Sequence, residues 1–170
     1  MKIKKLYLAT LTLLMVLMLV MTTTVSAYAY SNYESNVKTV KTYEKMSLIL
    51  DSQNSKGDSN SIQFKVSGLP KNAIITKLEI NTGDLSANGG IRNNYLEISG
   101  NGRSERIPWT GQANKILATN NFLMADANGT YTVSFNGTFV SGTIKNGRIL
   151  DIATKTYSNL KLIIYWDTME

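Results

Sequence analysis

The chain has 170 residues, with 18 Lys and Arg, 12 Asp and Glu, no His and no Cys. Without Cys there is no disulfide, thiolate nucleophile or Cys-ligated zinc. Without His there is no imidazole base, imidazole metal ligand or near-neutral pH switch.

Residues 1–27 are predicted to be a secretory signal peptide. Three lysines precede an apolar run over residues 6–21, and a stretch of small residues ends at Ala27, where we expect cleavage. An uncleaved membrane anchor is the alternative, but the run is short for a span of about 20 residues. Removing these three lysines from the 18 basic residues leaves 15 against 12 acidic residues, a net charge of +3.

We therefore expect the protein to be extracellular, or periplasmic if the source has an outer membrane. We expect no stable membrane span once the signal peptide is removed. A protein that is stable outside the cytoplasm without disulfides fits a bacterial source. The small net charge, and the lack of a basic stripe interleaved with aromatic residues, do not indicate a nucleic-acid partner.

The next polar segments are an arm and a loop. Residues 28–45 are predicted to form a flexible N-terminal arm, with a first edge strand as the alternative, and residues 51–61 a loop. The loop carries oxygen donors of the kind that calcium binds in groups of six to eight. Their spacing is not that of an EF-hand, and an ordinary turn stabilised by side-chain-to-backbone bonds is the alternative. We expect no other cofactor. The candidate calcium ligands are Asp51, Asn54, Asp58 and Asn60.

The remaining chain, residues 46–170, is predicted to be one antiparallel all-β domain. Asn-Gly occurs five times between residues 88 and 147, and this pair favours the type I′ turns of β-hairpins. We interpret these pairs as chain reversals, Asn128-Gly129 and Asn136-Gly137 included. Apolar and polar residues alternate, as in half-buried strands, over residues 62–66, 74–80, 96–98, 131–135 and 160–166. Weaker patterns cover residues 45–51, 103–109, 122–125, 138–144 and 147–154.

These segments predict a jelly-roll-like β-sandwich of about nine or ten strands. The last of them is apolar on both faces near its end, so we expect it to be a central strand.

Aromatic residues suggest a glycan surface. Trp109, Tyr157 and Tyr165 are candidates for a platform on which sugar rings stack, because the faces of both kinds of ring are apolar. The alternative is that the rings fill the core of the sandwich.

Acidic residues on the predicted strands suggest one further chemistry. Glu79, Glu97 and Glu105 alternate with apolar residues, and a glycosidase needs two carboxylates about 5–9 Å apart. The interpretation that we favour places each carboxylate separately in solvent, opposite the core.

Three stretches resemble a known family of β-sandwich modules. Residues 75–85 resemble a strand that ends in Asp-Leu, residues 95–102 the strand and turn that follow it, and residues 127–133 a Gly-Thr-Trp strand, with Tyr131 in place of the tryptophan. The family is the P-domain of proprotein convertases, in the wider galactose-binding-like group. The histidine of that family is missing here. The resemblance implies a jelly-roll module with a non-catalytic accessory or binding role.

We therefore expect a secreted binding or surface-interaction module that is not an enzyme. Its partner would be a glycan, a cell-wall polymer or another protein. One alternative is a self-associating extracellular matrix protein, a homo-oligomer in which the arm of residues 28–45 adds a strand to a neighbour's open sheet edge. Another is a hydrolase with an unrecognised carboxylate site.

Overall fold

The computed structural model of the protein describes residues 36–169. The predicted signal peptide and the first residues of the predicted arm lie outside the described residues. The described chain forms fourteen strands and no helix, and every strand pairing is antiparallel. The prediction of an all-β antiparallel β-sandwich is therefore confirmed. No helix of the described part is long and apolar enough to span a membrane.

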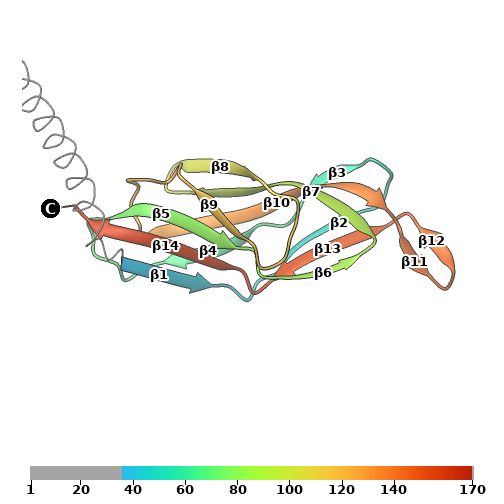
Figure 1. Cartoon of the computed structure of the whole chain (residues 1–170), viewed down its shortest axis with the longest axis horizontal. Helices are drawn as coiled ribbons and strands as arrows, with labels where there is room; N and C mark the ends of the chain where they lie inside the picture. The colour runs from blue at the N-terminus through green and yellow to red at the C-terminus, as the bar shows by residue number, and fades with distance from the viewer. Residues whose placement is uncertain (1–35, 170) are drawn as a thin grey trace, which may run out of the picture. The chain divides into compact units, whose positions relative to one another are not determined.

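The first layer consists of three long ribbons, each interrupted once, with a short strand at one edge (Figure 1). The order is β1-β14-β5-β9 on one side of the interruption and β2-β13-β6 on the other. The strands are β1 (Asn36–Lys41), β2 (Met46–Leu50), β5 (Ala73–Asn81), β6 (Asp84–Asn88), β9 (Ile116–Thr119), β13 (Ala153–Ser158) and β14 (Lys161–Thr168).

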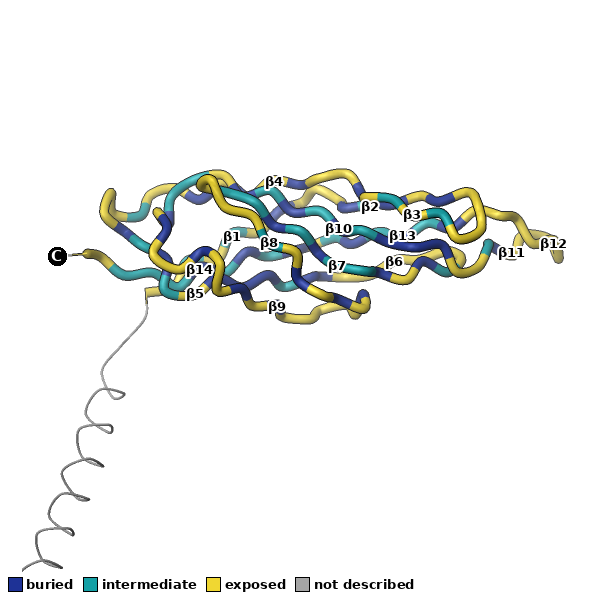
Figure 2. Tube along the Cα trace, turned by 90° about the horizontal axis from the view of Figure 1, so that it is seen from above, coloured by how far each residue is buried: buried dark blue, intermediate teal, exposed yellow. Residues whose placement is uncertain are grey.

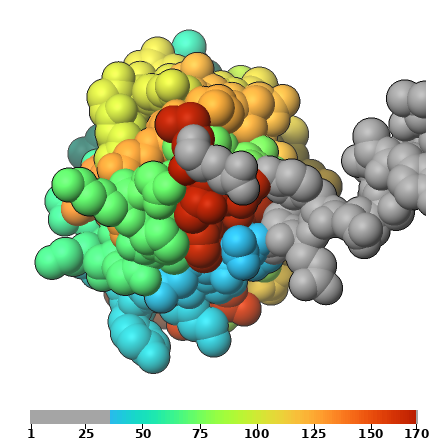
Figure 3. Space-filling model, turned by 90° about the vertical axis from the view of Figure 1, so that its left-hand side faces the viewer, coloured from blue at the N-terminus to red at the C-terminus, as the bar shows by residue number. Residues whose placement is uncertain are grey.

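The central place of β14 confirms the prediction that the last apolar segment is an inner strand. Figure 3 shows this end of the sandwich, with β14 in red between β5 in green and β1 in blue.

The second layer is built around β10 (Gly129–Ser141), which pairs with β7 (Gly90–Gly100) on one side and with two short strands on the other. The short strands are β3 (Lys56–Asp58) and β4 (Ile62–Val66), and β8 (Arg103–Pro108) lies at the far edge beside β7. A small separate hairpin, β11 (Thr143–Lys145) and β12 (Arg148–Leu150), extends beyond both layers (Figure 1).

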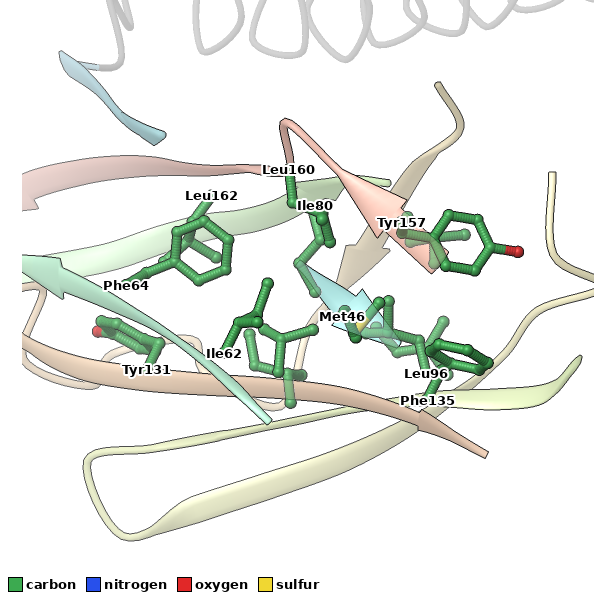
Figure 4. Close-up of a cluster of buried hydrophobic side chains, with 14 of the residues drawn as sticks. Met46, Ile62, Phe64, Ile80, Leu96, Tyr131, Phe135, Tyr157, Leu160 and Leu162 are labelled. Atoms are coloured by element: carbon green, nitrogen blue, oxygen red, sulfur yellow. The ribbon is translucent and has the colours of Figure 1, made fainter. Parts of the chain in front are cut away.

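The core lies between the layers and follows the predicted alternation. In β10, Tyr131, Val133 and Phe135 are completely buried, while the residues between them are partly exposed. Figure 4 shows rings and aliphatic side chains of both layers meeting in one cluster. Along the chain in Figure 2, buried and exposed residues alternate in most strands, whereas the β11–β12 hairpin is almost entirely exposed. One buried face per sheet is what a two-layer sandwich requires.

The strand pairs contain three register shifts, one of them between Phe139 and Ser141 of β10, and the other two disturb the alternation of β5 and β7. Opposite Tyr165 and Trp166 the register of β5 skips Thr76, so the buried set changes from Ala73 and Ile75 to Leu78 and Ile80. In β7 the register with β10 skips Asn94, which puts this side chain on the same outer side as its neighbour Tyr95. A bulge depends on the partner strand, and for this reason periodicity within one segment does not reveal it.

Two of the five Asn-Gly pairs form the expected turns. Asn101-Gly102 and Asn146-Gly147 have positive φ at both residues, and they connect β7 to β8 and β11 to β12.

The interpretation of Asn136-Gly137 as a reversal is wrong, because this pair lies inside β10. A Cβ on Gly137 would lie 2.6 Å from Ile91 Cγ2, so glycine is needed there for close packing. Asn128-Gly129 stands at the start of β10, and Asn88-Gly89 at the end of β6.

Several segment predictions also need correction. Residues 36–41, assigned to a flexible arm, form β1 and pair with β14 over six residues, as in the edge-strand alternative. Residues 56–58 of the predicted loop form β3. Residues 122–125 form a turn that buries Phe122, and they are not a strand. The count of fourteen exceeds the expected nine or ten because the long ribbons are interrupted and β3, β6 and β9 are too short to show a pattern.

Candidate functional site

Two of the four candidate calcium ligands, Asp58 and Asn60, have hydrogen-bond partners within the fold. The Asp58 carboxylate accepts a hydrogen bond from Asn136 Nδ2 at 2.7 Å. The Asn60 side chain accepts from the Ser47 amide at 2.6 Å and donates to the Lys45 carbonyl at 2.9 Å. Asn54 lies in a turn with φ 61°, and Asp51 is exposed directly after β2. The described residues contain no group of three or more acidic side chains that could hold a metal ion. The calcium site stays a prediction without support from this arrangement.

The glycan platform is wrong for two of its three residues. Trp109 and Tyr157 are 3% and 0% exposed, and their rings pack against each other with centroids 4.6 Å apart. Both also contact Phe135 edge-on. They therefore belong to the core, as in the alternative, and offer no ring face to a sugar.

Tyr165 stands apart from this cluster on β14. Its hydroxyl donates to Glu79 Oε2 at 3.1 Å, and Lys77 Nζ lies 5.0 Å from its ring centroid. Partial burial, reinforced by the neighbouring Glu79 carboxylate, raises the pKa of Tyr165. One partly exposed ring with its own ion-pair neighbours does not form a platform.

The three glutamates do not provide the two free carboxylates that a glycosidase needs. Glu79 is ion-paired with Lys77 at 2.7 Å in the first layer, and Glu97 with Arg106 at 2.9 Å in the second. Glu105 accepts a hydrogen bond from Thr119. Glu79 lies on the outer face of β5, opposite Ile163, as expected, but it is only 8% exposed because the side chains of Lys77 and Tyr165 contact it there.

The clearest unusual surface is the end of the molecule that carries the β11–β12 hairpin. Ile144 and Ile149 are 74% and 73% exposed and lie directly opposite each other in the hairpin register. Residues directly opposite share a face, so the two isoleucines form one apolar patch. Lys145 and Arg148 are also directly opposite, on the other face of the hairpin, and have no acidic partner among the described residues.

A pocket of about 330 Å³ lies at the base of this hairpin. Phe139, Val140 and Ile149 supply apolar walls, while Asn54 and Asp151 supply polar ones. Val140 is itself 63% exposed. We call the hairpin together with this pocket the hairpin end.

Sequence reasoning missed the hairpin end, although one signal was present. Residues 143–150 carry isoleucines on both sides of an Asn-Gly turn, which identifies a hairpin. The same alternation is typical of strands with a covered face, so it does not show that these isoleucines are exposed.

A second group of polar side chains is buried where β7, β13 and the loop after β8 meet. Asn93 Nδ2 donates to the Tyr157 hydroxyl at 3.3 Å, and that hydroxyl donates to the Gly111 carbonyl at 2.7 Å. Lys155 Nζ donates to the Ile91 carbonyl at 2.9 Å. Burial raises the pKa of Tyr157 and lowers that of Lys155.

Comparisons with known proteins give no family for this chain. No family model matches it, and no curated protein matches it. Among solved structures, FlhE is 17% identical, with 77% of this chain and 98% of that chain covered and a TM-score of 0.41. A candidate secreted protein of Eubacterium rectale is 14% identical, with 77% and 40% covered and a TM-score of 0.42. The VP2 protein of infectious bursal disease virus, from a subviral particle, is 14% identical, with 79% and 34% covered and a TM-score of 0.40. At these values the likenesses carry no argument about function.

Proposed function

We propose that the protein is a secreted, non-enzymatic surface-interaction module that binds a protein partner through the hairpin end. The observation that carries this proposal is the exposed pair Ile144 and Ile149 beside a pocket with both apolar and polar walls. Secretion rests on the predicted signal peptide of residues 1–27.

The apolar patch is a source of binding free energy. Completely burying one isoleucine side chain contributes about 1.5–3 kcal/mol. Ile144, Ile149 and Val140 are each more than half exposed, so most of that free energy is available to a complex. Association also has an entropic cost of several kcal/mol. We therefore expect a weak and reversible complex.

The charges of the hairpin indicate the charge of the partner. Lys145 and Arg148 face each other, and like charges directly opposite on a sheet destabilise it. An acidic side chain between them would relieve this repulsion. Two copies in contact through this charged face would bring four cations together, so a partner that covers this face is expected to be a different, acidic protein.

The shape of the hairpin end favours a protein over a polymer or a flat lipid surface. Binding hot spots are apolar anchors that fill pockets, and the pocket beside Ile149 provides such a receptacle. The hairpin also has two outer edges that pair with no other described strand, to which an extended segment of the partner can add by main-chain hydrogen bonds.

The alternative of self-association through the arm has less support. The described part of the arm, β1, is already paired with β14 of its own chain. The three glutamates considered for the hydrolase alternative do not support it, since Glu79, Glu97 and Glu105 each have another partner.

Site-specific photo-cross-linking in the source organism tests this proposal. A photoreactive amino acid at Ile149 is expected to give one dominant adduct with an acidic protein. The same label at Lys71, in the turn between β4 and β5 at the other end of the sandwich, is expected to give none (Figure 1). With the label moved to Val140, I144S/I149S is expected to reduce the adduct by about tenfold or more, because each isoleucine lost from a hot spot removes at least about 1 kcal/mol.

The variant K145E/R148E tests whether the partner is acidic. It should also abolish the adduct, while the melting temperature stays unchanged. The proposal fails if Ile149 and Lys71 give the same adducts, or if the adduct is the protein itself. It also fails if the purified protein co-sediments with phosphatidylglycerol vesicles through the hairpin, which would indicate a lipid surface.

A further inference from the structure

A second pocket lies on the side of the sandwich, between the end of β8 and the start of β9. Its volume is about 330 Å³, at the lower end of the range of small-molecule sites. Asn93 and Trp109 line it as buried side chains. Asn94, Gln112 and Lys115 supply polar groups at its rim, and Leu117 supplies an apolar wall.

The two buried residues each have an unpartnered polar atom. Asn93 is 4% exposed and its Oδ1 has no hydrogen-bond partner, and Trp109 is 3% exposed and its Nε1 has none. Buried polar groups are nearly always hydrogen-bonded, so two orphan atoms on residues that line one pocket call for an explanation. One orphan is an acceptor and the other a donor. A hydroxyl group is complementary to both, because it donates and accepts.

The electrostatic environment of the pocket is positive. Lys155 is 8% exposed and makes no ion pair with another described residue. Its amine lies directly behind Gly111, where a Cβ would be 2.6 Å from Lys155 Nζ and 2.9 Å from Asn93 Oδ1. Lys115 adds a second cation at the rim, and no Asp or Glu lines the pocket. A lysine at the rim of a pocket that no Asp or Glu lines favours an anionic ligand.

From these observations we propose that the pocket binds an acidic sugar residue, of the uronic acid class. A sugar hydroxyl would satisfy Asn93 Oδ1 and Trp109 Nε1, and the carboxylate would face Lys115, with the Lys155 charge behind it. The apolar face of the ring would lie against Leu117 and Pro108. In this arrangement Trp109 donates a hydrogen bond from the N–H at the edge of its indole ring. It does not stack its ring face on the sugar.

The site is separate from the hairpin end, so the two proposals stand or fall independently. The probes are trigalacturonic acid and its fully methyl-esterified form, which differ in the charge of the carboxyl groups and by one methyl group on each. Tryptophan fluorescence reports on the pocket once Trp166 is replaced by phenylalanine, since Trp109 is then the only tryptophan in the chain.

We expect trigalacturonic acid to produce a saturable change in Trp109 fluorescence and the ester to bind at least about tenfold more weakly, the effect of losing one charge-assisted hydrogen bond. Lys115→Glu should weaken binding by a similar factor. Lys65→Glu, the same charge change on an exposed residue of β4, should not. Both substituted residues are exposed, so the variants are expected to fold.

Three results would overturn the inference. The absence of a saturable change at millimolar trigalacturonic acid would mean that the pocket holds no such sugar. Equal binding of the ester would remove the acidic class, and equal weakening by K65E would show attraction by net charge alone. Unchanged binding by K145E/R148E is the expected sign that the pocket acts without the hairpin end.

Discussion

Tyr131 shows how burial sets the chemistry of a single residue. Its ring is completely buried, and its hydroxyl donates to the Asp126 carbonyl at 3.0 Å and accepts from Asn101 Nδ2 at 3.0 Å. Desolvation raises the pKa of Tyr131 to about 12, with Asp126 reinforcing the shift. The side chain thus ties the β7–β8 turn to the segment that leads into β10, and it does so only while it is neutral.

This shift predicts an alkaline loss of stability. The pKa of Tyr131 is about 10 in the unfolded chain and about 12 in the folded one. The unfolded chain therefore loses this proton first. The contribution is complete below pH 10 and disappears as the pH rises from about 10 to 12. Urea unfolding at pH 9 and at pH 11 measures the free energy of unfolding. Between these two pH values it should fall less for Tyr131→Phe than for the wild type. The difference should be at most about 1.4 kcal/mol per pH unit. Equal losses in the two proteins would contradict the assignment.

At the scale of elements, the main feature is the interruption that crosses the first layer. It separates β5 from β6 at Gly83, with φ 64°, and β13 from β14 at Asn159, with φ 58°. The Asp84 carboxylate accepts from Asn159 Nδ2 at 2.7 Å and from Asn114 Nδ2 at 3.4 Å, and these hydrogen bonds lower its pKa. Thr82 Oγ1 donates to the Gln112 carbonyl. These hydrogen bonds therefore fix the loop between β8 and β9, which borders the pocket that Asn93 and Trp109 line.

Gly83 is expected to be the most sensitive position of this interruption. A Cβ there would lie 2.0 Å from the Ser158 carbonyl oxygen, in addition to the strain of a positive φ. Gly68 has a φ of 82° but open space around it, and so provides a matched control. We expect Gly68→Ala to reduce the free energy of unfolding by about 1 kcal/mol and Gly83→Ala by about 3 kcal/mol or more. Chemical denaturation measures both, and equal losses would show that the close approach is not rigid.

For the whole molecule, the pairing of β1 with β14 makes β1, the first described strand of the chain, the edge strand of the first layer in place of β14. Without β1, the edge of β14 would present unpaired backbone groups, which are a template for association with another chain. The strand that the sequence suggested as a partner for a neighbour therefore covers the edge of β14 in its own chain, and the new edge carries Lys38 and Lys41, which discourage strand pairing.

Truncation tests this role of β1. A chain that begins at residue 42 lacks the strand, and one that begins at residue 36 keeps it. Relative to a chain that begins at residue 28, we expect the shorter form to lose about 2–4 kcal/mol of stability, about 1 kcal/mol for each of several hydrogen bonds. It should also dimerise or aggregate in sedimentation velocity, whereas the form that begins at residue 36 stays monomeric. A stable monomer that begins at residue 42 would show that β1 is dispensable.

The sequence by itself determined the features that depend on local chemistry. The lack of His and Cys excluded whole classes of reaction, and the alternation of Tyr131, Val133 and Phe135 identified a half-buried strand. Asn101-Gly102 and Asn146-Gly147 identified two turns, because the backbone preference of that pair acts within four residues. These signals are sufficient for an antiparallel sandwich.

Only the tertiary structure decided which apolar faces are covered and which polar groups meet. Ile144 and Tyr131 both follow strand periodicity, yet one is exposed and the other buried, because periodicity defines two faces and not what packs on them. Lys77 and Tyr165 cover Glu79 on the outer face of β5. Asn93 of β7 and Lys155 of β13 meet beside Gly111. Such contacts join residues far apart in sequence. They depend on the packing of the whole chain, and for that reason both proposed sites became visible only in the folded protein.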